Sequence, residues 1–115
     1  MALGLALPLI CWADWPEFRG PTGQGIVDEQ PAPVKWSETE NVQWKTPLPG
    51  TGWSSPVIRD GVVWLTTATE GGRSLRVLSV DAASGELARN VEIFRSERPP
   101  HKHEKNSYAT PTPIL

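Results

Sequence analysis

Proline and glycine interrupt this sequence so often that a long amphipathic helix has no room to form. Twelve Pro and ten Gly are spread over 115 residues, and proline inside a helix removes a hydrogen bond and clashes with the preceding turn. Between these interruptions the chain returns to short runs of Val, Ile, Leu, Trp and Thr, which favour pleated strands. We therefore predict an all-β fold.

The middle of the chain, from Ser54 to about Phe94, predicts four consecutive antiparallel strands. The runs are "SSPVIR", "VVWLTTA", "SLRVLSV" and "LARNVEIF". Asp60-Gly61 joins the first two and is the strongest hairpin signal in the chain, because Gly accepts a positive φ and Asp caps the turn. Residues 70–73, Glu-Gly-Gly-Arg, make the second turn.

The third turn lies in "SVDAASGEL". Asp81 can accept hydrogen bonds from the backbone N–H groups that follow it, and Ser84 can do the same more weakly. Gly85 can take the left-handed conformation that closes a tight loop. We expect these three residues to have a structural role in reversing the chain.

The two inner strands carry apolar residues on both faces, with Leu75 and Val77 on one and Leu78 and Val80 on the other. A single sheet of this kind leaves apolar surface uncovered, so the chain alone should be marginally stable and prone to aggregate. Neighbouring sheets in a stacked or radial array would cover both faces. The pattern predicts a β-propeller fragment, with residues 51–94 as its first four-stranded blade.

A second copy of the blade's opening follows. "NSYATPTPIL" repeats the pattern of "GWSSPVIR", with Tyr108 in place of Trp53 and Pro111 in place of Pro56, 55 residues later. This spacing exceeds the usual ~40–45 residues of a blade, and the surplus falls in a loop over residues 95–107. Residues 108–115 are then the start of a second blade.

Before the first blade, residues 14–40 predict an extended arm that Trp15 and Phe18 could anchor to a folded surface. Residues 41–50 follow as a further strand segment. Its run "NVQWKTPL" would place Val42, Trp44 and Thr46 on one face.

These motifs together resemble the pyrroloquinoline-quinone-like (PQQ-like) β-propeller repeat family. The turn "LSVDAASGEL" is similar to the repeat's own turn, and "DWPEFRGPTGQG", "NVQWKTPLPGTGWSSPVI" and "HKHEKNSYATPTPIL" are similar to the beginning of secreted bacterial PQQ-binding-like propeller proteins. The resemblance covers residues 14–115 and implies an N-terminal fragment. It also implies that segment 41–50 closes the ring by pairing in the last blade. Six residues are expected to have structural roles: Trp44, Pro56, Trp64, Asp81, Ser84 and Gly85.

The sequence departs from the family pattern in two respects. The repeat usually carries a Trp four residues after the turn glycine, where it packs against the neighbouring blade, but this chain has Arg89 there. The chain also holds little more than one repeat, whereas a full ring needs several.

The resemblance implies a non-enzymatic scaffold for binding or assembly in the cell envelope. Its partners would be the remaining blades and either envelope proteins or glycans. One alternative is a PQQ-dependent quinoprotein dehydrogenase, which would hold PQQ with calcium; no position here matches such ligands, so no catalytic or cofactor-binding residue is predicted. A second alternative is a glycan-binding module that uses Trp15, Trp36 and Trp53, since Trp44 and Trp64 are expected in the core.

Side chains that could bind a metal ion are clustered in the sequence only at His101-Lys102-His103-Glu104. On a strand, His101 and His103 would point the same way and could share Zn²⁺ or Cu²⁺. However, they lie in a proline-rich loop without a third ligand nearby in sequence. We therefore interpret them as part of a solvated loop.

The apolar run "MALGLALPLICWA", residues 1–13, is too short to span a bilayer and predicts a signal peptide, although the usual positive start is missing. A lipid anchor on Cys11 or a buried N-terminal segment are the alternatives. Export would place the protein in the periplasm or outside the cell. The net charge of −2, with both signs interspersed, gives no basic stripe, so nucleic acid is not expected as a partner.

Overall fold

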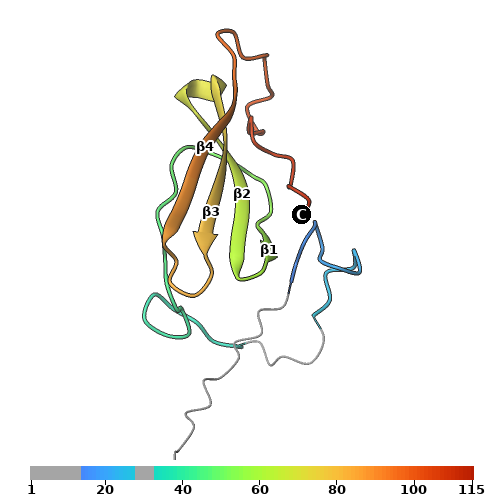
Figure 1. Cartoon of the computed structure of the whole chain (residues 1–115), viewed down its shortest axis with the longest axis vertical. Coiled ribbons are helices and arrows are strands. Elements are labelled where there is room, and N and C mark those ends of the chain that lie inside the picture. Colours follow the sequence, from blue (N-terminus) through green and yellow to red (C-terminus); the bar gives the residue numbers. More distant parts are fainter. Residues whose placement is uncertain (1–13, 28–32) are drawn as a thin grey trace, which may run out of the picture.

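The computed structural model describes residues 14–27 and 33–115, so the predicted signal peptide lies outside the described residues. Four strands form one open antiparallel sheet in the order β1-β2-β3-β4 (Figure 1). They are β1 (Val57–Arg59), β2 (Val62–Thr69), β3 (Ser74–Asp81) and β4 (Leu87–Arg95). The all-β class and the four-stranded meander are thus confirmed.

The β1–β2 hairpin follows from its turn residues. Arg59 pairs with Val62, which leaves Asp60 and Gly61 as a two-residue loop with φ of 51° and 73°. A two-residue loop with positive φ at both positions matches the right-handed twist of the flanking strands. The hairpin prediction is confirmed.

The sheet is apolar on both faces, as predicted, but the two faces are covered unequally. On one face Leu65 pairs with Leu78, and Leu78 is fully buried. On the other face Ala68 pairs with Leu75 and Thr66 with Val77; here Leu75 and Val77 are only half-buried. One apolar surface therefore stays partly open towards β4.

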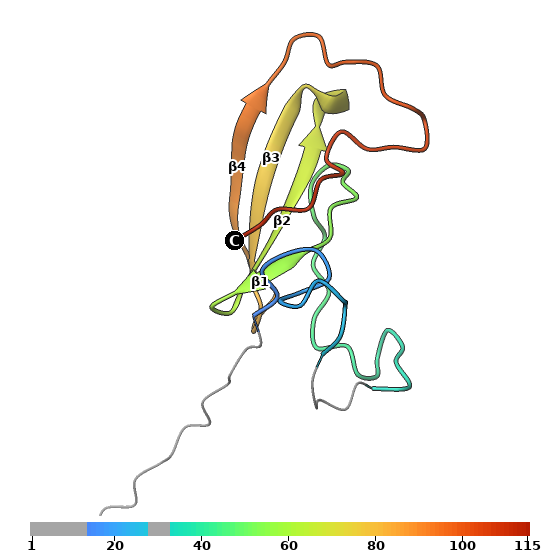
Figure 2. The same ribbon diagram turned by 90° about the vertical axis from the view of Figure 1, so that its right-hand side faces the viewer.

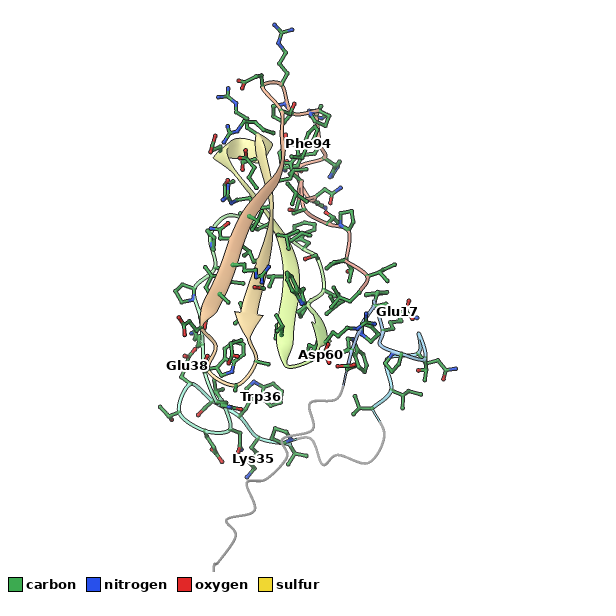
Figure 3. All side chains as sticks on the ribbon, viewed as in Figure 1. Glu17, Lys35, Trp36, Glu38, Asp60 and Phe94 are labelled. Atoms are coloured by element: carbon green, nitrogen blue, oxygen red, sulfur yellow. The ribbon has the colours of Figure 1, made fainter. Side chains whose placement is uncertain are left out.

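β4 forms one edge of the sheet, and it exposes more apolar side chains than its mixed sequence suggests. Its pairing with β3 is irregular at two places. Val91, Ile93 and Phe94 are 51%, 60% and 57% exposed, and Figure 3 shows Phe94 near the end of the strand. An edge strand with exposed apolar side chains is a surface on which other chains can dock.

The strand predicted within residues 41–50 does not form. This segment runs beside the sheet (Figure 1), and backbone pairing begins only at Thr51, which exchanges two 2.9 Å hydrogen bonds with Ala68. Pro47 and Pro49 cannot donate to a ladder, and residues 41–48 take part in no strand or bridge among the described residues. The segment is held by its side chains instead.

The first strand begins later in the chain than predicted, and residues 108–115 form no strand. β1 begins at Val57 because Pro56 has no N–H and because the Ser54 hydroxyl accepts the Thr66 N–H at 3.1 Å. Residues 108–115 lie beside this stretch without a ladder: the Ala109 carbonyl accepts the N–H groups of Trp53 and Ser54 at 2.9 and 3.1 Å. In both stretches, side-chain hydrogen bonds and a carbonyl shared by two N–H groups take the place of regular strand pairing.

The arm contacts the sheet at Trp15. Trp15 and Ile58 exchange two 2.8 Å backbone hydrogen bonds on the outer edge of β1, and Leu115 N–H donates to the Pro16 carbonyl at 3.0 Å. Figure 2 shows the arm close to β1. In residues 14–27 and 33–115 no helix has the length and apolar character needed to cross a membrane.

Candidate functional site

The turn between β3 and β4 is closed by its own side chains. Asp81 Oδ1 accepts the N–H of Ala83 at 3.1 Å and of Ser84 at 2.7 Å, and the Ser84 hydroxyl donates to the same oxygen at 2.8 Å. Gly85 has φ of 75° and donates its N–H to the Asp81 carbonyl at 2.8 Å. The Ser84 backbone N–H, and then its hydroxyl, hold the pKa of Asp81 below its ordinary value.

Trp44 packs on this turn. A Cβ atom on Gly85 would lie only 2.5–2.7 Å from the Trp44 ring, so the indole occupies the space that a side chain would need. The indole Nε1–H donates to the Ala82 carbonyl at 2.9 Å. On either side of Trp44, Gln43 Nε2 donates to the Ala83 carbonyl at 2.9 Å and the Thr46 hydroxyl bonds to the Gly85 carbonyl. Residues 43–46 thus dock on the turn through one ring and three polar side-chain contacts.

The turn between β2 and β3 lies at the other end of the sheet and has a similar partner. It is the short 3-10 turn η1 (Glu70–Gly72), in which Gly72 has φ of 92°. A Cβ atom on Gly72 would lie 2.4–2.6 Å from the Tyr108 ring. The Lys102 ammonium stands over the same ring, 5.4 Å from its centroid, which is within the range of a cation–π contact.

Charged side chains on β4 hold η1 from the sheet side. Arg95 binds both oxygens of Glu70, at 2.9 and 3.0 Å, and also binds Glu92 at 2.9 Å. The Ser74 hydroxyl donates to Glu92 at 2.5 Å. Hydrogen bonds from Arg95 lower the pKa of Glu70 and of Glu92 from their ordinary values.

An open groove of about 420 Å³ lies between η1, the Thr51 bridge and the loop that carries Lys102. Thr51, Thr69, Lys102 and Tyr108 are among the residues that line it. Of the residues described, the groove is lined by one cation, Lys102, whose ammonium also stands over the Tyr108 ring. Its only carboxylate in the described part of the chain is that of Glu70, so its wall contains no pair of carboxylates for acid–base chemistry.

The structure brings four of the six predicted structural residues into one cluster, formed by Trp44, Asp81, Ser84 and Gly85. The other two lie apart from it. Pro56 is exposed just before β1, and Trp64 is half-buried in β2, where it pairs with Val57.

The two histidines do not form a metal centre with other residues. His101 and His103 are exposed and lie in an irregular loop, and the His103 Nδ1 atom accepts the Lys105 N–H at 3.1 Å. Within the described part of the chain no group of three or more His, Cys, Asp and Glu residues could hold a metal ion.

Sequence reasoning missed the contact of Tyr108 with Gly72. The only signal that could have pointed to it was the repeated pattern around Trp53 and Tyr108, which marks both as aromatic residues at the same place in a unit. The three loop tryptophans also differ from one another: Trp15 is half-buried, whereas Trp53 and Trp36 are 58% and 71% exposed. Figure 3 shows Trp36 beside Lys35, away from the sheet.

Comparisons with protein-family models, with curated proteins and with solved structures find no match for this sequence or fold. Any function therefore has to be argued from the sheet, its two turns and the segments that dock on them.

Proposed function

We propose that the chain is part of a PQQ-like β-propeller repeat protein that acts as a non-enzymatic binding or assembly scaffold in the cell envelope. The observation that carries this proposal is the packing of Trp44 on the Gly85 turn, with its indole N–H on the Ala82 carbonyl. It joins a segment outside the sheet to the turn that resembles the family's repeat.

This contact has the form expected between neighbouring blades. In the family a Trp packs against the adjacent blade, and the resemblance assigns segment 41–50 to the last blade of the ring. Trp44 belongs to that segment and meets the turn of the first blade. Arg89, which stands at the Trp position of this sheet's own repeat, is exposed, so its side chain is free to meet a different partner.

Contacts between equivalent positions give a second support. Ser54 and Ala109 hold the same place in the two repeats, and the Ser54 N–H donates to the Ala109 carbonyl at 3.1 Å. Units arranged around a common axis place equivalent residues of adjacent units next to each other near that axis. This contact supports the proposal that a second unit begins beside the first.

The open apolar surface supports a scaffold role. Val91, Ile93 and Phe94 are more than half exposed on β4, and apolar surface at a strand edge favours protein–protein docking. A scaffold needs such surfaces and needs no catalytic group.

The main test compares the scaffold with the quinoprotein alternative. The purified protein is titrated with PQQ and Ca²⁺ and then assayed for dye reduction with alcohols. We expect no saturable PQQ uptake and no dye reduction. Saturable uptake together with alcohol-dependent reduction would overturn the scaffold proposal.

The envelope location is tested separately. Residues 1–13 and the following arm are fused to a reporter phosphatase that is active only after export. We expect activity comparable to that of a fusion with an established signal peptide, and a fusion that starts at Asp14 serves as the inactive control. Equal inactivity of both fusions would contradict export through this segment.

A glycan-binding role is the second candidate, favoured by the exposure of Trp36 and Trp53. Flat indole faces stack on the apolar faces of sugars. Titration with oligosaccharides should quench Trp fluorescence if this role is correct, and W36A and W53A variants would show which indole responds. A titration without any response would remove this candidate.

A further inference from the structure

Aromatic rings from outside the sheet cover left-handed glycines at three places in this chain. Trp15 covers Gly20, Trp44 covers Gly85 and Tyr108 covers Gly72; in each case an added Cβ would lie 2.4–2.7 Å from ring atoms. The common cause is physical, because a glycine with positive φ presents bare backbone against which a flat ring can pack. The chain thus uses one kind of contact to attach segments to turns.

Trp53 is one of several aromatic residues that cover no glycine among the described residues, and it is the one whose place in the repeat matches that of Tyr108. It matches Tyr108 in sequence, since Trp53-Ser-Ser-Pro and Tyr108-Ala-Thr-Pro occupy the same place in the two repeats. Tyr108 is half-buried on Gly72, whereas the Trp53 side chain is 58% exposed. Of the two equivalent positions, only that of Tyr108 has a turn of the described chain beneath the ring.

The backbone that carries Trp53 is already fixed. The N–H groups of Trp53 and Ser54 donate to the Ala109 carbonyl, and the Ser55 N–H donates to the Thr112 hydroxyl at 3.0 Å. An indole held on an ordered backbone loses little freedom when it binds, which favours a docking role over an incidental exposed position.

We propose that Trp53 docks on a further sheet unit built like this one, and that its indole covers a left-handed glycine in a β-hairpin turn of that unit, as Tyr108 covers Gly72. This inference rests on the proposed function, because it takes the chain to be one unit of a repeating array. It assigns Trp53 to protein docking and not to sugar binding.

The chain itself supplies the probe. The acceptor is a W53A/Y108A double variant, which presents Gly72 without its ring and has no Trp53 of its own. The donor is the wild-type chain, and binding is measured by titration calorimetry. We expect saturable binding of the wild-type donor and binding at least about tenfold weaker for a W53A donor, the size of loss typical of a central aromatic residue.

Two controls distinguish specific docking of Trp53 from non-specific association. A W36A donor lacks another exposed indole and should bind the acceptor like the wild type. An acceptor that also carries Gly72→Ala should not bind, because the added Cβ fills the place of the ring. If the Y108A acceptor lacks the circular dichroism of the folded sheet, a W53A/Y108S acceptor, whose side chain is also too small to cover Gly72, is used with the same donors.

Equal binding of wild-type and W53A donors, or no binding to a folded acceptor, would overturn the inference. Sugar-induced quenching that W53A abolishes would also overturn it and would favour the glycan role. The proposed scaffold function fails by a different result, namely PQQ-dependent dye reduction, so the two failures can be told apart.

Discussion

The two turns at the ends of β3 are stabilised in different ways. Both place a left-handed glycine under an aromatic ring, Gly72 under Tyr108 at one end and Gly85 under Trp44 at the other (Figure 1). The Gly85 turn is closed from within, by hydrogen bonds of Asp81 and Ser84. The Gly72 turn is held from outside, by Arg95 on β4.

This difference separates local from long-range stabilisation. A turn that is closed by its own residues can form before the rest of the chain packs, whereas η1 needs β4 and the segment around Tyr108 to be in place. The rings differ as well, since Trp44 donates a hydrogen bond to the turn and the Tyr108 hydroxyl makes none among the described residues. Substitutions at the two turns should therefore have different consequences.

The largest effects should come from filling the space beneath the rings. Gly72→Ala and Gly85→Ala should each lower the free energy of unfolding by about 2–4 kcal/mol, because the left-handed conformation disfavours a side chain and the new Cβ displaces an aromatic ring. Gly71→Ala is the matched control, because Gly71 also has a positive φ, of 66°, but nothing lies within 4 Å of an added Cβ. It should cost about 1–2 kcal/mol, the conformational part alone.

Urea unfolding followed by circular dichroism measures all three variants. If Gly71→Ala destabilises the chain as much as the other two substitutions do, ring packing contributes nothing and the comparison of the two turns fails. A loss of the cooperative transition for Gly72→Ala and Gly85→Ala alone would be the strongest form of the expected result.

A smaller effect should distinguish the two rings. Trp44→Phe keeps an aromatic ring but loses the hydrogen bond to the Ala82 carbonyl, which should cost about 1 kcal/mol beyond the loss of ring area. Tyr108→Phe removes a hydroxyl without a partner in the described structure and should change stability by less than about 0.5 kcal/mol. The same urea experiment applies, and equal losses for the two variants would show that the indole N–H contributes no net stability.

Local signals in the sequence predict both turns, but they do not predict the aromatic ring that covers the second one. Asp81, Ser84 and Gly85 form a recognisable pattern because each acts on a neighbour in the chain. Residues 70–73 were recognised as a turn, but nothing in them indicates that a ring 36 positions later covers Gly72. The strands were predictable for the same reason, since alternation and turn residues are local.

Segment 41–50 shows where local signals mislead. Its alternation predicts a strand, yet a strand needs a partner edge, and residues 41–50 form no bridge with the described residues; pairing begins just after them, between Thr51 and Ala68. Trp44 and Thr46 are half-buried with Lys45 exposed between them, as the alternation predicts, whereas Val42, predicted on the same face, is 43% exposed. The pairing of this segment with a last blade stays a prediction. Which edge a segment pairs with is a long-range property that a single sequence does not encode in its periodicity.

The smallest effect concerns the ionisable groups of the two turns. The pKa of Asp81 and of Glu70 are both lowered in the folded chain, so each contributes stability above its ordinary pKa, near 3.8 and 4.5 respectively, and this contribution is lost as the pH falls through the lower folded value. The causes differ. Ser84 N–H and hydroxyl groups act on Asp81, whereas the Arg95 guanidinium acts on Glu70. Both carboxylates lie at the surface, so the stabilisation is modest.

Salt and one substitution at each turn should separate these causes. In about 1 M salt, where the screening length is about 3 Å, the pKa of Glu70 should rise towards its ordinary value and that of Asp81 should move less, because hydrogen bonds from neighbouring residues are screened little. Arg95→Gln should raise the pKa of Glu70, and that of Glu92 with it, but not that of Asp81. Ser84→Ala should raise the pKa of Asp81 but not that of Glu70. Carboxyl ¹³C shifts followed through a pH titration measure both groups in one sample. Equal salt-induced shifts at the two carboxylates would show that the β3–β4 turn also depends on charges from outside, and the distinction between a turn closed from within and one held from outside would no longer stand.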